Sequence, residues 1–229
     1  IIIPVYKSLE VNDRIAIKQA IKMTPGVDKT FIMPDNLPID ESFTEFSDFL
    51  VERFENHYFT SKMSYNRLML SINFYKRFID YKYMLIHQTD VFLFKPDLQY
   101  WCNKNYDYIG APWLRPHKIN KAKIYSQVIN AFPGIFSHRL KNRVKHYNNV
   151  GNGGLSLRKI DSFVRILESA ETKPILNFYL ERQLSKGSLY NEDVFWSIEG
   201  PNLYEKFTKP SWSEACFFSL ENYPSFAYN

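Results

Sequence analysis

The sequence predicts an α/β protein with a Rossmann-type open, mostly parallel sheet flanked by helices. Short, continuous apolar runs, typical of strands buried on both faces, alternate along the chain with segments whose apolar residues recur with helical spacing. The length of 229 residues is that of one domain, and 45% hydrophobic and 17% aromatic residues can fill a large core. We therefore expect a single domain over residues 1–229, with a basic insertion at about 114–147.

The first third of the chain is expected to contain two strands and one helix. Residues 1–5 (IIIPV) form a continuous apolar run, and the helix that follows is expected to be capped by Ser8 and to end at Thr24, before the Pro-Gly pair. A second short strand is expected at 31–33. Residues 35–63 are polar and aromatic without a clear period, so we expect them to be irregular.

The middle of the chain is expected to hold one long helix and three strands. The helix begins at Ser64, since apolar residues then recur on one face. Two strands, at 83–86 and 91–94, flank the polar tetrapeptide HQTD at 87–90. A further strand at 106–113 ends in a tight turn.

The last third begins with a glycine-rich segment. Three of the eight glycines fall within residues 150–158, and a helix with apolar residues at 160–167 follows. Asn191 is expected to cap another helix, and a short helix is expected at 213–218. Closely spaced glycines let a backbone approach a ligand, but they are equally typical of a β-bulge or tight turn. The pattern is neither a dinucleotide fingerprint nor a phosphate-binding P-loop.

The composition restricts the cellular compartment that we expect for the protein. No apolar run approaches the ~20 residues of a membrane-spanning helix. Two cysteines fit a reducing compartment, so we expect a cytoplasmic protein; because the sequence starts at Ile1, we also expect the original N-terminus to be missing.

The net charge of +5 comes from one acid-free segment with eight basic residues, namely Arg115, Lys118, Lys121, Lys123, Arg139, Lys141, Arg143 and Lys145. Residues 136–147 can form an amphipathic helix with a basic side, either solvated or in contact with an anionic acceptor or the inner membrane face.

Two groups of carboxylates are candidates for chemistry. Asp90 directly follows a strand, where an open α/β sheet binds its ligands, and it can ligate a divalent cation; it can equally be a turn residue. Glu192 and Asp193 open a helix, where acids are favoured by the helix dipole, but either can act as a general base.

Four segments together resemble a family of bacterial domains of unknown function that is related to nucleotide-sugar glycosyltransferases of the GT-A fold. They are YMLIHQTDVFLF at 83–94, YDYIGAPW at 106–113, VGNGGLSLR at 150–158 and NEDVFWS at 191–197. The resemblance implies a GT-A-like sheet and transfer of a sugar from a nucleotide-diphosphate sugar to a glycan or lipid-linked acceptor in cell-surface glycan biosynthesis. Nucleic acid is not an expected partner.

The resemblance also implies roles for individual residues. Gln88, Thr89 and Asp90 take the place of the D-x-D motif, so Asp90 would hold Mn²⁺ or Mg²⁺ together with the donor diphosphate. Gly153 and Gly154 would line the donor sugar or acceptor, and Pro4, Val5 and Tyr6 would meet the nucleotide base. Asp193 would be the catalytic base of an inverting enzyme, beside Glu192.

Two departures from the family pattern support an alternative. Gln88 replaces the first acid of the D-x-D motif, and no histidine follows His146. The alternative is a non-catalytic nucleotide- or carbohydrate-binding module on the same fold.

Overall fold

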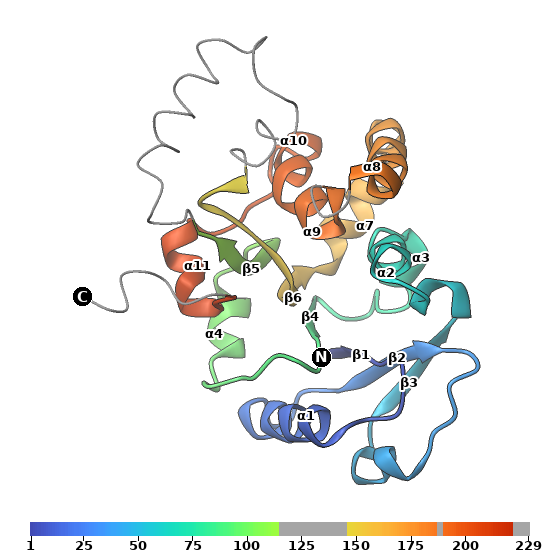
Figure 1. Ribbon diagram of the computed structural model, residues 1–229. Helices are drawn as coiled ribbons and strands as arrows, with labels where there is room; N and C mark the ends of the chain where they lie inside the picture. Colours follow the sequence, from blue (N-terminus) through green and yellow to red (C-terminus); the bar gives the residue numbers. More distant parts are fainter. Residues whose placement is uncertain (115–145, 187–189, 222–229) are drawn as a thin grey trace.

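The computed structural model describes residues 1–114, 146–186 and 190–221, and six strands of this part form one sheet (Figure 1). The strands are β1 (Ile2–Pro4), β2 (Thr30–Pro34), β3 (Leu50–Phe54), β4 (Tyr83–His87), β5 (Tyr108–Trp113) and β6 (Asn149–Lys159). Their order across the sheet is β3-β2-β1-β4-β6-β5. β1 to β4 pair in parallel, whereas β6 is antiparallel to both of its neighbours. The predicted α/β fold with an open, mostly parallel sheet is confirmed.

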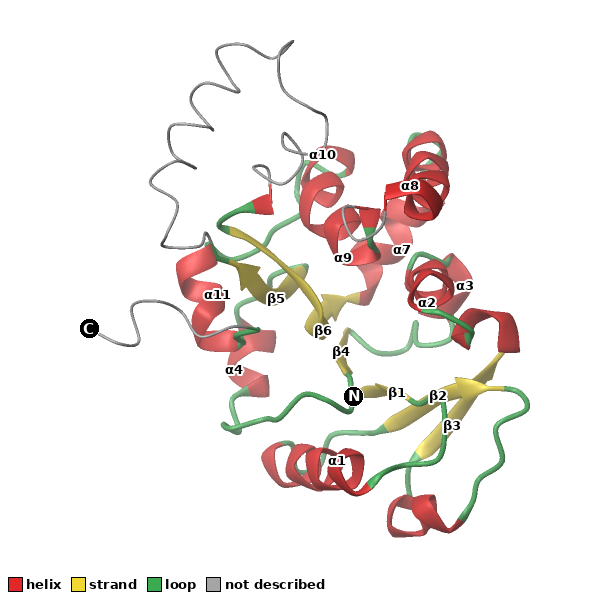
Figure 2. Cartoon of the chain, in the orientation of Figure 1, coloured by secondary structure: helices red, strands yellow, loops and turns green. Residues whose placement is uncertain are grey.

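Helices cover both faces of the sheet (Figure 2). They are α1 (Val11–Met23), α2 (Lys62–Met69), α3 (Ile72–Lys76), α4 (Leu98–Asn103), α7 (Ile160–Glu168), α8 (Thr172–Lys186), α9 (Glu192–Val194), α10 (Gly200–Leu203) and α11 (Trp212–Phe218). Side chains of α1, α4 and α11 pack into a core on one face, and side chains of α2, α3, α7, α8 and α9 pack into a core on the other. Successive residues of β4 alternate between the two cores, which explains its continuous apolar sequence.

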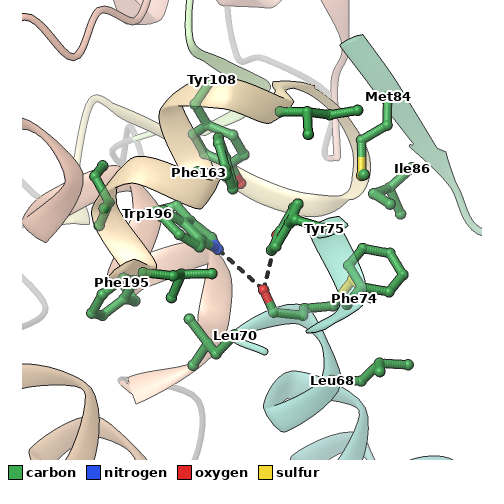
Figure 3. Packing of buried hydrophobic residues seen from close by; sticks show 14 of the residues in the cluster. Leu68, Leu70, Phe74, Tyr75, Met84, Ile86, Tyr108, Phe163, Phe195 and Trp196 are labelled. Atoms are coloured by element: carbon green, nitrogen blue, oxygen red, sulfur yellow. Dashed lines mark hydrogen bonds between the residues drawn. The ribbon is translucent and has the colours of Figure 1, made fainter. Parts of the chain in front are cut away.

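The core on the α7 face is dominated by aromatic rings (Figure 3). Tyr75, Phe163 and Trp196 contact one another, with ring centroids 4.0–5.9 Å apart. The Tyr75 hydroxyl and the Trp196 Nε1 both donate to the Met69 carbonyl, at 2.9 and 3.4 Å. These bonds join the end of α2 to α3 and to the π-helical turn Phe195–Glu199 that follows α9.

The same bonds explain why the expected long helix from Ser64 is wrong. α2 begins at Lys62, with Ser61 as its cap, and α3 is a separate helix. Ser71 adopts an extended backbone between them, while the Met69 carbonyl bonds to the side chains of Tyr75 and Trp196. The cap predicted for the first helix is also wrong: Glu10 is the N-cap, and its N–H donates to Asp13 at 2.9 Å.

Two strand assignments are corrected as well. Residues 35–63 contain β3, an edge strand that was not apparent because its first side chain, Leu50, is 55% exposed. Residues 91–94 are not a strand, and their backbone bonds instead to α1, where Gln19 Nε2 donates to the Leu93 carbonyl at 2.8 Å. The predicted helix at 160–167 is present as α7, whereas α4 and α8 were not predicted.

Most of the basic insertion, including residues 136–145 of its predicted helix, lies outside the described residues. The segments before and after the insertion meet at the sheet, where the Asn148 N–H donates to the Trp113 carbonyl at 2.8 Å. Within the described ranges, the helices are all too short or too polar to cross a membrane.

Candidate functional site

A cavity of about 1140 Å³ opens at the carboxyl ends of β1 and β4. After β1 the chain continues to β2 on one side, and it later returns to place β4 on the other side. The cavity therefore lies where the strand order reverses, which is where open α/β sheets bind their ligands. Because β6 is antiparallel, its first half reaches the same edge, and His87 of β4 pairs with Leu155.

The end of β4 forms one wall of the cavity. The Gln88 N–H donates to the Gly154 carbonyl at 2.9 Å, and the Val91 N–H donates to the Gln88 carbonyl at 3.1 Å. This turn leaves Thr89 partly exposed and Asp90 exposed at the cavity. The carboxylate of Asp90 is thus available to a ligand or a cation.

The end of β1 supplies a second wall, from Pro4 and Tyr6. Tyr6 packs edge-on against Phe59 and Tyr65, with ring centroids 5.7 and 5.8 Å apart. Burial, followed by the charge of Asp90, raises the pKa of the Tyr6 hydroxyl, so it stays protonated. Val5 does not line the cavity: its side chain is buried in the core on the α1 face.

The glycine-rich segment is part of β6 rather than a loop. Its pairing with β5 is irregular next to Ala111, in agreement with the alternative of a β-bulge. Gly153 and Gly154 nevertheless line the cavity. A Cβ on Gly153 would overlap Glu192 Oε1, so the glycine is required for close approach of α9 to β6.

The Glu192 carboxylate that meets Gly153 is held by Arg158. The Arg158 Nη2 lies 3.0 Å from Glu192 Oε1, and both side chains are buried. Arg158 also donates to the Ser156 hydroxyl at 3.0 Å and to the Tyr75 hydroxyl at 2.8 Å. Burial raises the pKa of Glu192, and the nearby guanidinium opposes this shift. Because Glu192 is the first residue of α9, its ion pair with Arg158 fixes the start of this helix against β6.

Asn191 occupies the predicted N-cap position of α9, but its side chain makes no capping hydrogen bond to the helix. Its Oδ1 instead accepts a hydrogen bond from Asn66 Nδ2 of α2, at 3.0 Å, in a buried position. This bond ties the start of α9 to α2.

Asp193 is half-buried and lines the cavity next to Glu192. Its Oδ1 accepts a hydrogen bond from the Val194 N–H at 2.8 Å. Burial, together with the neighbouring charge of Glu192, raises the pKa of Asp193 to about 7. A carboxylate with this pKa can take up and release a proton near neutral pH.

The fold therefore brings nearly all of the residues proposed from the sequence to one cavity. They are Pro4, Tyr6, Gln88, Thr89, Asp90, Gly153, Gly154, Glu192 and Asp193. Arg158, Tyr65 and Asn66 were missed. Arg158 could have been found, because a cation within the apolar half of a strand requires a buried anionic partner.

The carboxylates do not form a complete cation site by themselves. Within the described part of the chain, His, Cys, Asp and Glu side chains nowhere gather in threes around a point that could hold a metal ion. Asp90 offers a hard oxygen ligand of the kind that Mg²⁺ and Mn²⁺ prefer, but these ions need several such ligands. A cation at Asp90 would need oxygens from a bound ligand.

Comparison with known proteins gives a family but no activity. No curated protein matches the chain. A family described as "Protein of unknown function (DUF5672)" matches residues 48–229. This region includes β4, the glycines of β6 and the Glu192–Asp193 pair, and by this match over most of its length the chain belongs to the DUF5672 family.

Proposed function

We propose that the protein is a glycosyltransferase that moves a sugar from a nucleotide-diphosphate sugar to a glycan or lipid-linked acceptor. The observation that carries the proposal is that Asp90 and Asp193 line one cavity at the point where the strand order reverses. Asp90 is exposed at the end of a parallel strand, and Asp193 has a pKa of about 7. One carboxylate thus suits the phosphate end of a donor and the other suits proton transfer.

In this proposal, Asp193 is the general base of an inverting transfer. It takes the proton of an acceptor hydroxyl while the acceptor oxygen forms a bond to the anomeric carbon of the donor sugar. The bond from that carbon to the diphosphate breaks, and the nucleoside diphosphate leaves with the electron pair. The Arg158–Glu192 pair fixes the start of α9, so Asp193 does not have to be oriented at the moment of reaction.

The remaining residues would position the donor. Pro4 and Tyr6 would face the nucleotide base, and Gly153 and Gly154 would allow the sugar to approach the backbone of β6. Asp90 would hold Mg²⁺ or Mn²⁺ jointly with the diphosphate oxygens, and the cation would offset the charge of the leaving group.

The acceptor and the location belong to the proposal as well. The acid-free basic segment would attract an anionic acceptor, such as a lipid-linked diphosphate, at the cytoplasmic face of the membrane. Reversing the charges of Arg139, Lys141, Arg143 and Lys145 should then weaken acceptor use, most strongly at low salt, and leave donor hydrolysis unchanged.

A second candidate is a nucleotide- or carbohydrate-binding module without activity. The observation in its favour is Gln88, an amide where the D-x-D motif of GT-A glycosyltransferases has a carboxylate, which leaves Asp90 with few partners for a cation.

A screen of nucleoside diphosphates and nucleotide sugars separates the candidates. A ligand that binds the folded state raises the melting temperature by mass action. We expect stabilisation by a nucleotide sugar that requires Mn²⁺ or Mg²⁺ and is reduced by Asp90→Asn. The control variant, Asp35→Asn, changes an exposed carboxylate that does not line the cavity. Release of sugar from the stabilising donor supports the transferase, binding without turnover supports the module, and no stabilisation contradicts both.

A further inference from the structure

Two residues that line the cavity each carry a buried polar atom with no hydrogen-bond partner within the described part of the chain. These atoms are the hydroxyl of Tyr65 in α2 and Oε2 of Glu192 in α9. The two residues are only 5% and 4% exposed, and both line the cavity. An unpaired buried polar group loses its hydrogen bonds to water without replacement, so folded proteins seldom leave such groups unpaired without a reason.

Both side chains are held in place by their surroundings. Glu192 Oε1 is bound by Arg158 at 3.0 Å, which fixes the direction of Oε2. The Tyr65 ring packs against the Tyr6 ring, with centroids 5.8 Å apart. The residues next to them in sequence, Asn66 and Asn191, are joined by a hydrogen bond of 3.0 Å, which ties α2 to α9 at this point. The two side chains therefore belong to a preorganised part of the cavity lining.

The chemistry of this pair selects one kind of ligand group. Burial raises the pKa of the Tyr65 hydroxyl, so it keeps its proton and can donate. Glu192 Oε2 can accept, and the charge of its carboxylate is balanced by Arg158. The diphosphate of a nucleotide sugar has only acceptor oxygens and would be repelled by Glu192, whereas an ammonium group would add a second cation beside Arg158. An alcohol donates to Glu192, accepts from Tyr65 and adds no charge.

We propose that Tyr65 and Glu192 form a subsite for a hydroxyl group of a sugar ring. The inference rests on the proposed function, because it assigns the subsite to the sugar of the donor or to a sugar of the acceptor. It goes beyond that function by naming Tyr65 as a residue that recognises the sugar and not the nucleotide.

Isothermal titration calorimetry of Tyr65→Phe tests the proposal. The probes are UDP and GDP, a panel of UDP- and GDP-hexoses, and neutral oligosaccharides. The matched control is Tyr81→Phe, which removes a hydroxyl that donates to Asp28 at 2.9 Å and does not line the cavity. Because the Tyr65 hydroxyl has no partner to lose, Tyr65→Phe should melt at or above the wild-type temperature.

We expect Tyr65→Phe to bind the sugar-bearing ligand about tenfold more weakly and the nucleoside diphosphate unchanged, while Tyr81→Phe binds both as the wild type does. A loss confined to nucleotide hexoses assigns the hydroxyl to the donor, and a loss confined to oligosaccharides assigns it to the acceptor. The subsite would be overturned if Tyr65→Phe bound all sugar-bearing ligands as the wild type does. It would also be overturned if Tyr65→Phe lost as much affinity for UDP or GDP without a sugar as for the sugar-bearing ligands. A wild type that binds oligosaccharides but no nucleotide refutes the proposed transferase while the Tyr65 comparison still decides the subsite. A wild type that binds no probe contradicts both.

Discussion

Arg158 of β6 and Glu192 of α9 form an ion pair in the protein interior, with side chains 0% and 5% exposed. Each belongs to a segment that also contributes to the cavity, namely Gly153 and Gly154 on β6 and Asp193 on α9. The pair therefore couples the position of the proposed base to the strand that faces the substrate. Its loss should affect both stability and the geometry of the cavity.

Replacing Arg158 with methionine should lower the free energy of unfolding by about 3–5 kcal/mol, because the Glu192 carboxylate would stay buried without its partner. Urea denaturation measures the loss. The control is Arg165→Met, which breaks an exposed pair with Asp161 and should cost less than about 1 kcal/mol. Similar losses of unfolding free energy in the two variants would show that the buried ion pair stabilises the protein no more than an exposed one.

Gly153→Ala should be destabilising by about 1–3 kcal/mol, since the added methyl would overlap the Glu192 carboxylate. Gly154→Ala is the matched variant. Its new Cβ would lie 3.1 Å from Oε1 of Gln88 and 3.2 Å from Oδ1 of Asn152, which are ends of side chains that can shift by a few tenths of an ångström. Denaturation of both variants tests the packing of α9 on β6, and the packing is wrong if the second substitution is as costly as the first.

His87 predicts a pH dependence of stability. It is fully buried, neither ring nitrogen has a partner within the described residues, and burial lowers its pKa from 6.5 to about 4. Between these two pH values the unfolded chain binds a proton that the folded chain does not, so the free energy of unfolding falls as the pH decreases. His87→Leu removes this effect.

The free energy of unfolding of His87→Leu minus that of the wild type, measured by urea denaturation, should therefore become more positive from pH 7 to pH 5. His57→Leu, which replaces a histidine whose side chain is 57% exposed, is the control. A constant difference between wild type and His87→Leu at all pH values would mean that His87 titrates normally in the folded state.

The sequence predicts the buried strands of this fold better than it predicts the edge strand and the helices. Continuous apolar runs identify β1, β2 and β4, because both faces of these strands are covered. β3 escapes this criterion because it is an edge strand. The long helix expected from Ser64 was wrong because side chains of Tyr75 and Trp196, distant in sequence from each other, bond to the Met69 carbonyl.

The candidate site could be predicted residue by residue but not as a unit. Asp90 and Asp193 were identified from their positions after a strand and at a helix start. Their common cavity depends on the antiparallel direction of β6 and on the Arg158–Glu192 pair, which are long-range contacts without a local signal. Tyr65 was missed because a buried tyrosine looks like a core residue in the sequence.

The proposed role of Asp193 requires it to be deprotonated to accept a proton. With a pKa of about 7, the wild-type kcat/KM for sugar transfer should rise with pH and level off above neutrality. A profile that is flat from pH 5 to pH 9 would assign the proton transfer to another group.

The most direct test of the account compares sugar transfer by wild type and Asp193→Asn, using a donor identified by thermal stabilisation. Asp161→Asn is the control, since that carboxylate is exposed and does not line the cavity. We predict that Asp193→Asn lowers kcat by about 100-fold or more while the Kd for the donor stays within about twofold, because the base acts on the acceptor in the transition state. Turnover by Asp193→Asn near the wild-type rate would contradict the account.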